Sequence, residues 1–182
     1  MDLGLQGKVI LVAGMGPVGE AVARRLLEEG AFPCVLEGVA GDRYSLTADL
    51  DDPAACIRII KIIRDHFGHI DGLVDLGGDH RSVVSMSFPY LEETNGAIVQ
   101  VVPADEKLNL PESLGTKVRV SVVLVKDHPD QPTRWERVMG FGTRRPPSMT
   151  RERIAAMVVS LFSDSGRDQV GEGSTQERFF HV

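Results

Sequence analysis

The feature that most constrains this chain is a glycine-rich turn between an apolar strand and an amphipathic helix. Residues 8–13 form a short run rich in β-branched side chains, which indicates a parallel strand covered on both faces. The next six residues, Gly14-Met15-Gly16-Pro17-Val18-Gly19, match the pattern G-x-G-x-x-G. Apolar residues then recur at helical spacing until Gly30, a residue type that commonly ends helices. This order predicts a nucleotide-binding unit that extends to about Gly78.

The three glycines of the turn have separate tasks in such a unit. The first permits a tight turn, the second lets the backbone approach a pyrophosphate, and the third permits close packing of the helix. The positive end of the helix dipole then faces the phosphates. We therefore predict that the whole turn contributes to cofactor binding, through Gly14, Met15, Gly16, Pro17, Val18 and Gly19.

Glu37 is the candidate for recognition of the cofactor ribose. It follows Gly14 by 23 residues, at the predicted end of the second strand. A carboxylate at this place can accept hydrogen bonds from a ribose diol and would repel a 2′-phosphate, so it favours NAD(H) over NADP(H). The alternative interpretation is a surface glutamate beside a turn.

Strand and helix patterns alternate along the rest of the chain. We expect further strands over residues 33–37, 44–48, 71–74, 97–102, 118–125 and 178–182, and helices over 52–68 and after Thr150. In the helix over 52–68, the apolar face is expected to contain Ile57, Ile60, Ile63 and Phe67, widened by Ile59 and Ile62. This alternation predicts one α/β domain over residues 1–182, with a Rossmann-like, doubly wound, mostly parallel sheet of about six or seven strands. Residues 126–149 contain four prolines and are expected to form an irregular loop or lid.

Charge and composition argue against some classes of binding partner. The net charge of −6 argues against a general nucleic-acid binder, and no segment is apolar enough over about 20 residues to cross a membrane. The N-terminus has no signal-peptide pattern, and two cysteines cannot form a disulfide framework, which favours a cytoplasmic protein. An arginine-rich segment over residues 134–153 is either a solvated surface or a site for a ligand phosphate or carboxylate.

Several segments resemble the short-chain dehydrogenase/reductase family. The matching segments are residues 7–12, 23–31, 48–50, 66–74 and 153–164, so the resemblance covers both ends of the chain and little of its middle. It implies the same α/β fold and an NAD(H) cofactor. It also adds to the expected cofactor-binding residues Asp49, Leu50, Gly77 and Gly78.

The residues that carry catalysis in that family are missing. Only 18 residues lie between Gly78 and Ala97, too few for the family's long helix with its catalytic asparagine, and Val101-Val102-Pro103 stands where its serine is expected. Neither tyrosine has a lysine four residues later, so the Tyr-x-x-x-Lys pair is absent. The chain therefore looks like a truncated, divergent member that lacks the machinery for ordinary carbonyl reduction.

The shortened middle leaves one face of the sheet in need of cover. We expect residues 79–96 and 104–116 to supply short loops or helices there. An uncovered apolar face would promote aggregation, so a second copy of the chain is expected to complete the cover in a homo-oligomer.

Polar residues after the fourth strand are the remaining candidates for chemistry. Asp75, Asp79 and His80 lie where open α/β sheets bind ligands, and a carboxylate that orients a histidine can serve acid–base chemistry. We take Asp79 and His80 as candidate catalytic residues; the alternative is polar loop residues on a shortened connection. His66 and His69 have no convincing metal-ligand spacing, so no metal is predicted.

Three functions remain open from the sequence. The first is a redox-neutral enzyme, such as a cyclase, isomerase or dehydratase, or a small-molecule-binding protein, in a biosynthetic pathway. The second is an NAD(H)-dependent oxidoreductase with a replaced proton donor, such as His80 or Tyr90. The third is a structural or regulatory subunit without catalysis.

Overall fold

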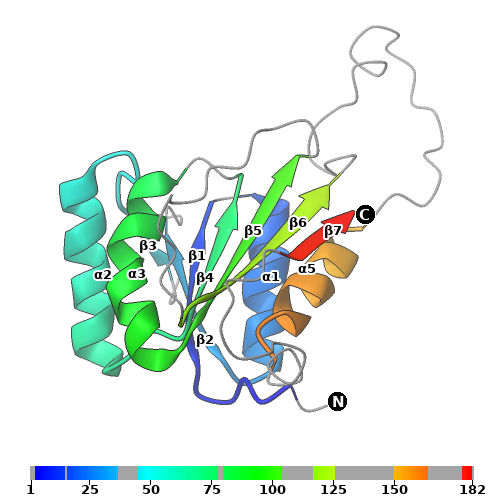
Figure 1. Ribbon diagram of the computed structural model, residues 1–182, viewed down its shortest axis with the longest axis horizontal. Coiled ribbons are helices and arrows are strands. Elements are labelled where there is room, and N and C mark those ends of the chain that lie inside the picture. The colour runs from blue at the N-terminus through cyan, green and yellow to red at the C-terminus, as the bar shows by residue number, and fades with distance from the viewer. Residues whose placement is uncertain are drawn as a thin grey trace, which may run out of the picture.

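A computed structural model describes residues 3–14, 16–36, 45–77, 80–103, 117–125, 150–163 and 178–181. These residues form a parallel sheet with helices on both faces (Figure 1). The strands are β1 (Val9–Ala13), β2 (Phe32–Leu36), β3 (Ser45–Leu46), β4 (Gly72–Leu76), β5 (Ala97–Pro103), β6 (Arg119–Val125) and β7 (Arg178–His181). The helices in this part of the chain are α1 (Pro17–Glu28), α2 (Pro53–Phe67), α3 (Arg81–Thr94) and α5 (Arg151–Ser160).

The seven strands are arranged in the order β3-β2-β1-β4-β5-β6-β7, and each pairing is parallel. The sequence order therefore reverses between β1 and β4, which is where open α/β sheets form their ligand crevice. The prediction of a Rossmann-like, doubly wound sheet with six or seven strands is confirmed. Residues 126–149, the predicted lid, lie outside the described residues.

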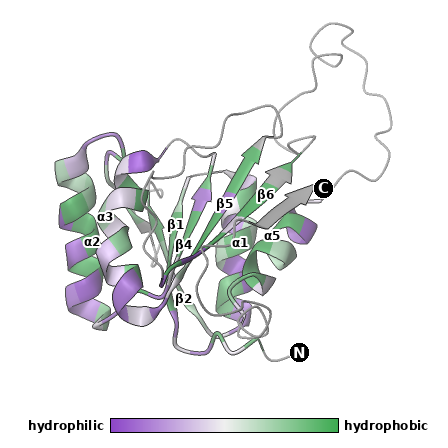
Figure 2. Ribbon diagram, in the orientation of Figure 1, coloured by the Kyte–Doolittle hydropathy of each residue, from purple (hydrophilic) through white to green (hydrophobic). Residues whose placement is uncertain are grey.

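Each face of the sheet buries its own hydrophobic core. Alternate residues of every strand point to opposite faces, so neighbours such as Val9 and Ile10 belong to different cores. One core packs under α1 and α5, and the other packs under α2 and α3. Figure 2 shows hydrophobic residues along β5 and β6, and a mixture of hydrophobic and hydrophilic residues around α2 and α3. This distribution is expected where strands are covered and helices have one solvated side.

Helix α2 shows how local signals set the ends of an element. Its start is capped by Asp52, whose side chain accepts from the Ala54 amide at 2.9 Å, and it ends at Gly68, which has φ 84°. The predicted apolar face is partly wrong, because Ile57 and Ile62 are 49% and 59% exposed. The buried face instead contains Cys56, Ile59, Ile60 and Ile63.

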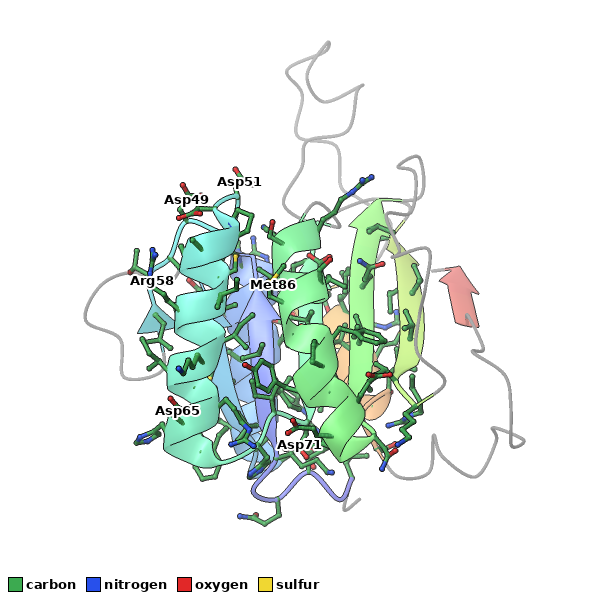
Figure 3. All side chains as sticks on the ribbon, turned by 60° about the vertical axis from the view of Figure 1, so that its left-hand side comes forward. Asp49, Asp51, Arg58, Asp65, Asp71 and Met86 are labelled. Carbon is green, nitrogen blue, oxygen red and sulfur yellow. The ribbon has the colours of Figure 1, made fainter. Side chains whose placement is uncertain are left out.

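The described part of the connection between β4 and β5 consists mostly of one helix. Residues 81–94 form the 14-residue helix α3, which buries Val83, Val84 and Leu91 in the core beside α2 (Figure 3). The expectation that residues 79–96 supply short loops or helices as cover is thus confirmed for residues 81–94. A full helix fits because His80 directly precedes it and because Asn95 and Gly96 lead from its end into β5. Residues 104–116, the other expected cover, lie outside the described part.

Burial makes both thiols poor nucleophiles. Cys34 in β2 and Cys56 in α2 are buried and form no disulfide. Burial raises the pKa of the Cys34 thiol to about 11. The pKa of Cys56 is also raised, first by burial and then by the neighbouring carboxylates of Asp52, Asp49 and Asp51.

We predict that the folded protein does not react with a disulfide reagent at about pH 8, whereas the denatured chain yields both thiols. Between the ordinary pKa of 9.0 and about 11, the unfolded chain releases the Cys34 proton that the folded chain retains. The contribution of Cys34 to stability is therefore complete below pH 9.0 and is lost as the pH rises toward about 11. Urea denaturation of the wild type and of a Cys34→Val variant measures this difference. Rapid labelling of the native protein would contradict the buried placement of the thiols.

Candidate functional site

The turn after β1 is shaped by close approach of backbone segments. Gly14 has φ 105°, and a Cβ at this position would lie 2.6 Å from the Leu76 carbonyl oxygen at the end of β4. A Cβ on Gly19 would lie 2.8 Å from the Gly14 carbonyl oxygen. Both distances are shorter than real Cβ contacts allow, so these two glycines let β1, β4 and α1 meet.

Gly16 differs from the other two glycines because no atom of the described residues lies near the position of an added Cβ. It has φ 133° and ψ 174°, a region that essentially only glycine occupies, and a methyl group added to it would meet no atom of the described residues within 4 Å. It is the N-cap of α1, and no side chain of the described residues caps this helix. Backbone N–H groups at an uncapped helix start can bind an anion. The geometry around Gly16 thus leaves room for a phosphate; Met15, between the two glycines, lies outside the described residues.

The other predicted cofactor-binding residues have different surroundings. Gly77 directly follows β4 with φ 113°, and its amide donates to the Val101 carbonyl at 2.9 Å. Asp49 lies beside the start of α2 (Figure 3), and its side chain accepts from the Asp51 amide at 3.0 Å. Leu50 is buried in the core under α2, where it serves packing. The remaining predicted site residues, Glu37, Gly78 and Asp79, lie outside the described part of the chain.

A buried polar network joins the ends of β4 and α3. Asp75 is fully buried, and its Oδ1 lies 2.8 Å from His80 Nδ1. Its Oδ2 accepts a hydrogen bond from Gln100 Nε2 at 3.0 Å, because Asp75 and Gln100 are direct partners in the parallel register of β4 and β5. The side chain of His80 is 17% exposed, so it lies between the buried carboxylate and the surface.

Gln100 was not among the predicted site residues, although the sequence contains a pattern that could have identified it. It is the one polar residue in the run from Ala97 to Val102, which is otherwise apolar. A polar residue inside a strand that is covered on both faces requires a buried hydrogen-bond partner. Its partner is 25 residues away, and only the strand register identifies it.

The network gives His80 a defined chemical form. A carboxylate only accepts hydrogen bonds, so in the 2.8 Å contact His80 Nδ1 is the donor and Asp75 Oδ1 is the acceptor. A histidine in this form can take up and return a proton. Tyr90, the other replacement donor considered, packs against the core about 15 Å further along α3. The structure therefore brings His80, and not Tyr90, to the end of β4.

At the opposite end of the sheet, where β1 and β4 begin, other charged groups lie close together. They do not form a candidate catalytic site. His69 Nε2 lies 3.2 Å from Asp71 Oδ2, and Lys8 lies 3.7 Å from the other oxygen of the same carboxylate. A cavity of about 10 Å³ beside Lys8 and Phe162 has room for a single water.

Among the described residues, no cluster of three His, Cys, Asp or Glu side chains could bind a metal. Within the same ranges, none of the helices has the length and hydropathy needed to span a membrane.

Solved structures with the same arrangement of strands and helices are dehydrogenases and reductases. The aldohexose dehydrogenase of Thermoplasma acidophilum has a TM-score of 0.69 and 16% identity, over 100% of this chain and 95% of that chain. A short-chain dehydrogenase/reductase from Serratia marcescens has a TM-score of 0.67 and 19% identity, over 97% of each chain. This chain has a short-chain dehydrogenase/reductase fold. The resemblance expected from the sequence is thus confirmed at the level of the fold.

A third solved structure contains a bound cofactor. The enoyl-(acyl-carrier-protein) reductase of Anaplasma phagocytophilum, in complex with NAD, has a TM-score of 0.71 and 15% identity, over 97% of this chain and 92% of that chain. No family model matches the sequence. At these identities the likeness concerns the fold, and the function must be argued from the residues of the site.

We predict that Gly14→Ala destabilises the fold more than Gly7→Ala does. Gly7 has φ 77° and open space at its Cβ, so its substitution costs only the backbone strain of about 1–2 kcal/mol. In Gly14→Ala, the added Cβ also clashes with the Leu76 backbone, so the loss of folding free energy is larger by a further ~1–3 kcal/mol. Urea denaturation measures both variants. Equal losses would show that β1 and β4 do not approach each other as closely as described.

Proposed function

We propose that this protein binds NAD(H) at the turn between β1 and α1 and uses His80, oriented by Asp75, for redox-neutral proton transfer on a small molecule. The reaction would be of the cyclase, isomerase or dehydratase type, as part of a biosynthetic pathway. The observation that carries this proposal is the 2.8 Å contact between His80 Nδ1 and the buried Asp75 carboxylate. It puts a histidine of defined tautomer at the end of the sheet where parallel sheets bind ligands.

Cofactor binding is supported by the geometry of the glycine turn. Gly16 has the backbone conformation and the open space that a pyrophosphate requires, and it directly precedes the uncapped start of α1. The Anaplasma reductase, which has the same fold, is in complex with NAD. The preference for NAD(H) over NADP(H) depends on Glu37 and remains a prediction from the sequence.

The proposal of redox-neutral chemistry comes from what the sequence lacks. Hydride transfer to a carbonyl needs a group that supplies the proton, and the family uses its Tyr-x-x-x-Lys pair for this step. This sequence has no such pair, and Val101-Val102-Pro103 replaces the expected serine. An imidazole beside a carboxylate can still move protons between carbon or oxygen atoms of a bound substrate.

An NAD(H)-dependent oxidoreductase is the second candidate. The glycine turn and His80 together favour it, because an imidazole near a nicotinamide could replace the missing tyrosine as proton donor. NADH absorbance distinguishes the two candidates, since only the oxidoreductase consumes NADH with a panel of carbonyl compounds. A subunit without catalysis is the third candidate, and it predicts neither NADH consumption nor proton exchange.

Two further expectations belong to this proposal. A second copy of the chain would cover the part of the sheet beyond α3, where β5 and β6 extend past the helix (Figure 3). The free, buried cysteines suit a reducing, cytoplasmic setting.

We predict that Gly16→Ala abolishes NAD(H) binding while the protein still folds, with some loss of stability because an alanine at φ 133° is strained. The added methyl group would meet no atom of the described residues, but it would occupy the space of the pyrophosphate. Gly68→Ala is the matched control, because Gly68 also has a positive φ and open space but lies at the far end of α2. Calorimetry with NAD(H) should show binding by the wild type and by Gly68→Ala alone. Equal affinity in Gly16→Ala would refute the assignment of the turn.

We predict that His80→Gln lowers proton exchange on a bound substrate by about 10²–10⁴-fold, the usual loss for a missing acid–base group. Incorporation of deuterium from solvent into enolisable ketones, followed by NMR, measures this reaction without NADH turnover. His66→Gln is the control, since His66 packs edge-on against Phe67 on α2. Full exchange by the His80 variant would remove His80 from the mechanism.

A further inference from the structure

Gln100 is a buried polar side chain whose presence packing does not explain. It is 1% exposed, and its neighbours on the same face of β5, Ile98 and Val102, are buried hydrophobic residues. Its Oε1 is buried and has no hydrogen-bond partner among the described residues. A buried carbonyl oxygen without a donor lowers stability, and an apolar side chain would fill this space without that penalty.

The orientation of the amide follows from its partner. Asp75 as a carboxylate can only accept, so the amide must direct Nε2 toward Asp75 Oδ2, as the 3.0 Å contact shows. Oε1 is then turned away, and no described residue donates to it. The contact occupies one carboxylate oxygen and leaves the other, Oδ1, for His80.

We infer that Gln100 is a positioning residue for His80 and acts through Asp75. By fixing the rotation of the Asp75 carboxylate, it directs Oδ1 at His80 Nδ1 and so keeps the neutral imidazole in the Nδ1–H form. The lack of a donor to Oε1 among the described residues is the cost of this arrangement. The inference deepens the proposed function, because it concerns the group that we propose as the acid–base residue.

Loss of the hydrogen bond from Gln100 should also change the titration of His80 in solution. Its N–H donates to the carboxylate and stabilises the charged form. Without this donor, the buried carboxylate binds a proton more strongly, whether that proton resides on His80 or on Asp75 itself. Loss of Gln100 should therefore raise the pH at which the pair releases its proton, and loss of the carboxylate should lower it.

The test is ¹⁵N NMR of the histidine side chains in the full-length, ligand-free protein, with the His80 signal assigned by its loss in His80→Gln. We expect the wild type to show the Nδ1–H tautomer of His80. Gln100→Met keeps an unbranched side chain of similar length and should move the titration midpoint upward by roughly one pH unit. Asp75→Asn should move it downward and populate both tautomers. An unchanged midpoint and tautomer in Gln100→Met would overturn the inference.

Matched variants separate positioning from packing. Ile98→Val removes a buried methyl group from the same face of β5 and leaves the Gln100 amide in place, so it should leave the His80 titration unchanged. If Gln100→Met does not fold, Gln100→Asn retains the amide but withdraws it by one methylene, and it should raise the midpoint in the same direction. A shift of equal size in Ile98→Val would attribute the effect to packing and overturn the inference.

The NMR readout is independent of the proposed function. A shifted midpoint in a protein that neither binds NAD(H) nor exchanges protons would refute the proposed function and retain the role of Gln100. If NAD(H) binding and proton exchange are normal but the midpoint is unshifted, the role of Gln100 is refuted and the proposed function is retained.

Discussion

The candidate site depends on the contact between the ends of β1 and β4. No Cβ fits between Gly14 and the Leu76 carbonyl, so the two strands end against each other and against the start of α1. This contact fixes the point where the strand order reverses. It also brings the open turn at Gly16 to the same end of the sheet as Asp75, which pairs in register with Ala13. The glycine turn and the pair of Asp75 and His80 are therefore parts of one backbone junction.

The parts of the fold that follow from local sterics could be predicted from the sequence. The glycine turn, the Asp52 cap and the Thr150 cap each depend on residues that are adjacent in the chain, and the structure contains all three. The buried face of α2 could not be placed as reliably. Five isoleucines surround this helix, and the rotation of the helix on the sheet determines that Ile59, Ile60 and Ile63 are buried. That rotation depends on contacts with distant strands.

The candidate site shows the same division between local and distant information. Asp75 and His80 are five residues apart, so their proximity could be anticipated from the sequence. Gln100 joins them only through the pairing of β4 with β5, and its pairing cannot be read from local spacing. The unsatisfied oxygen of Gln100 then becomes visible only in the packed structure. A buried polar network of this kind lowers stability unless every member is satisfied, which makes its presence informative about function.

The short step along the chain from β4 to α3 places His80. Only three residues lie between the end of β4 at Leu76 and His80, and α3 begins directly afterwards. The four steps along the backbone from Leu76 to His80 span at most about 14 Å, which keeps the histidine near the strand that holds Asp75. Helix α3 in turn anchors the connection by burying Val83, Val84 and Leu91 in the core. Helix α3 thus covers the sheet, and the histidine that directly precedes it lies against a buried carboxylate.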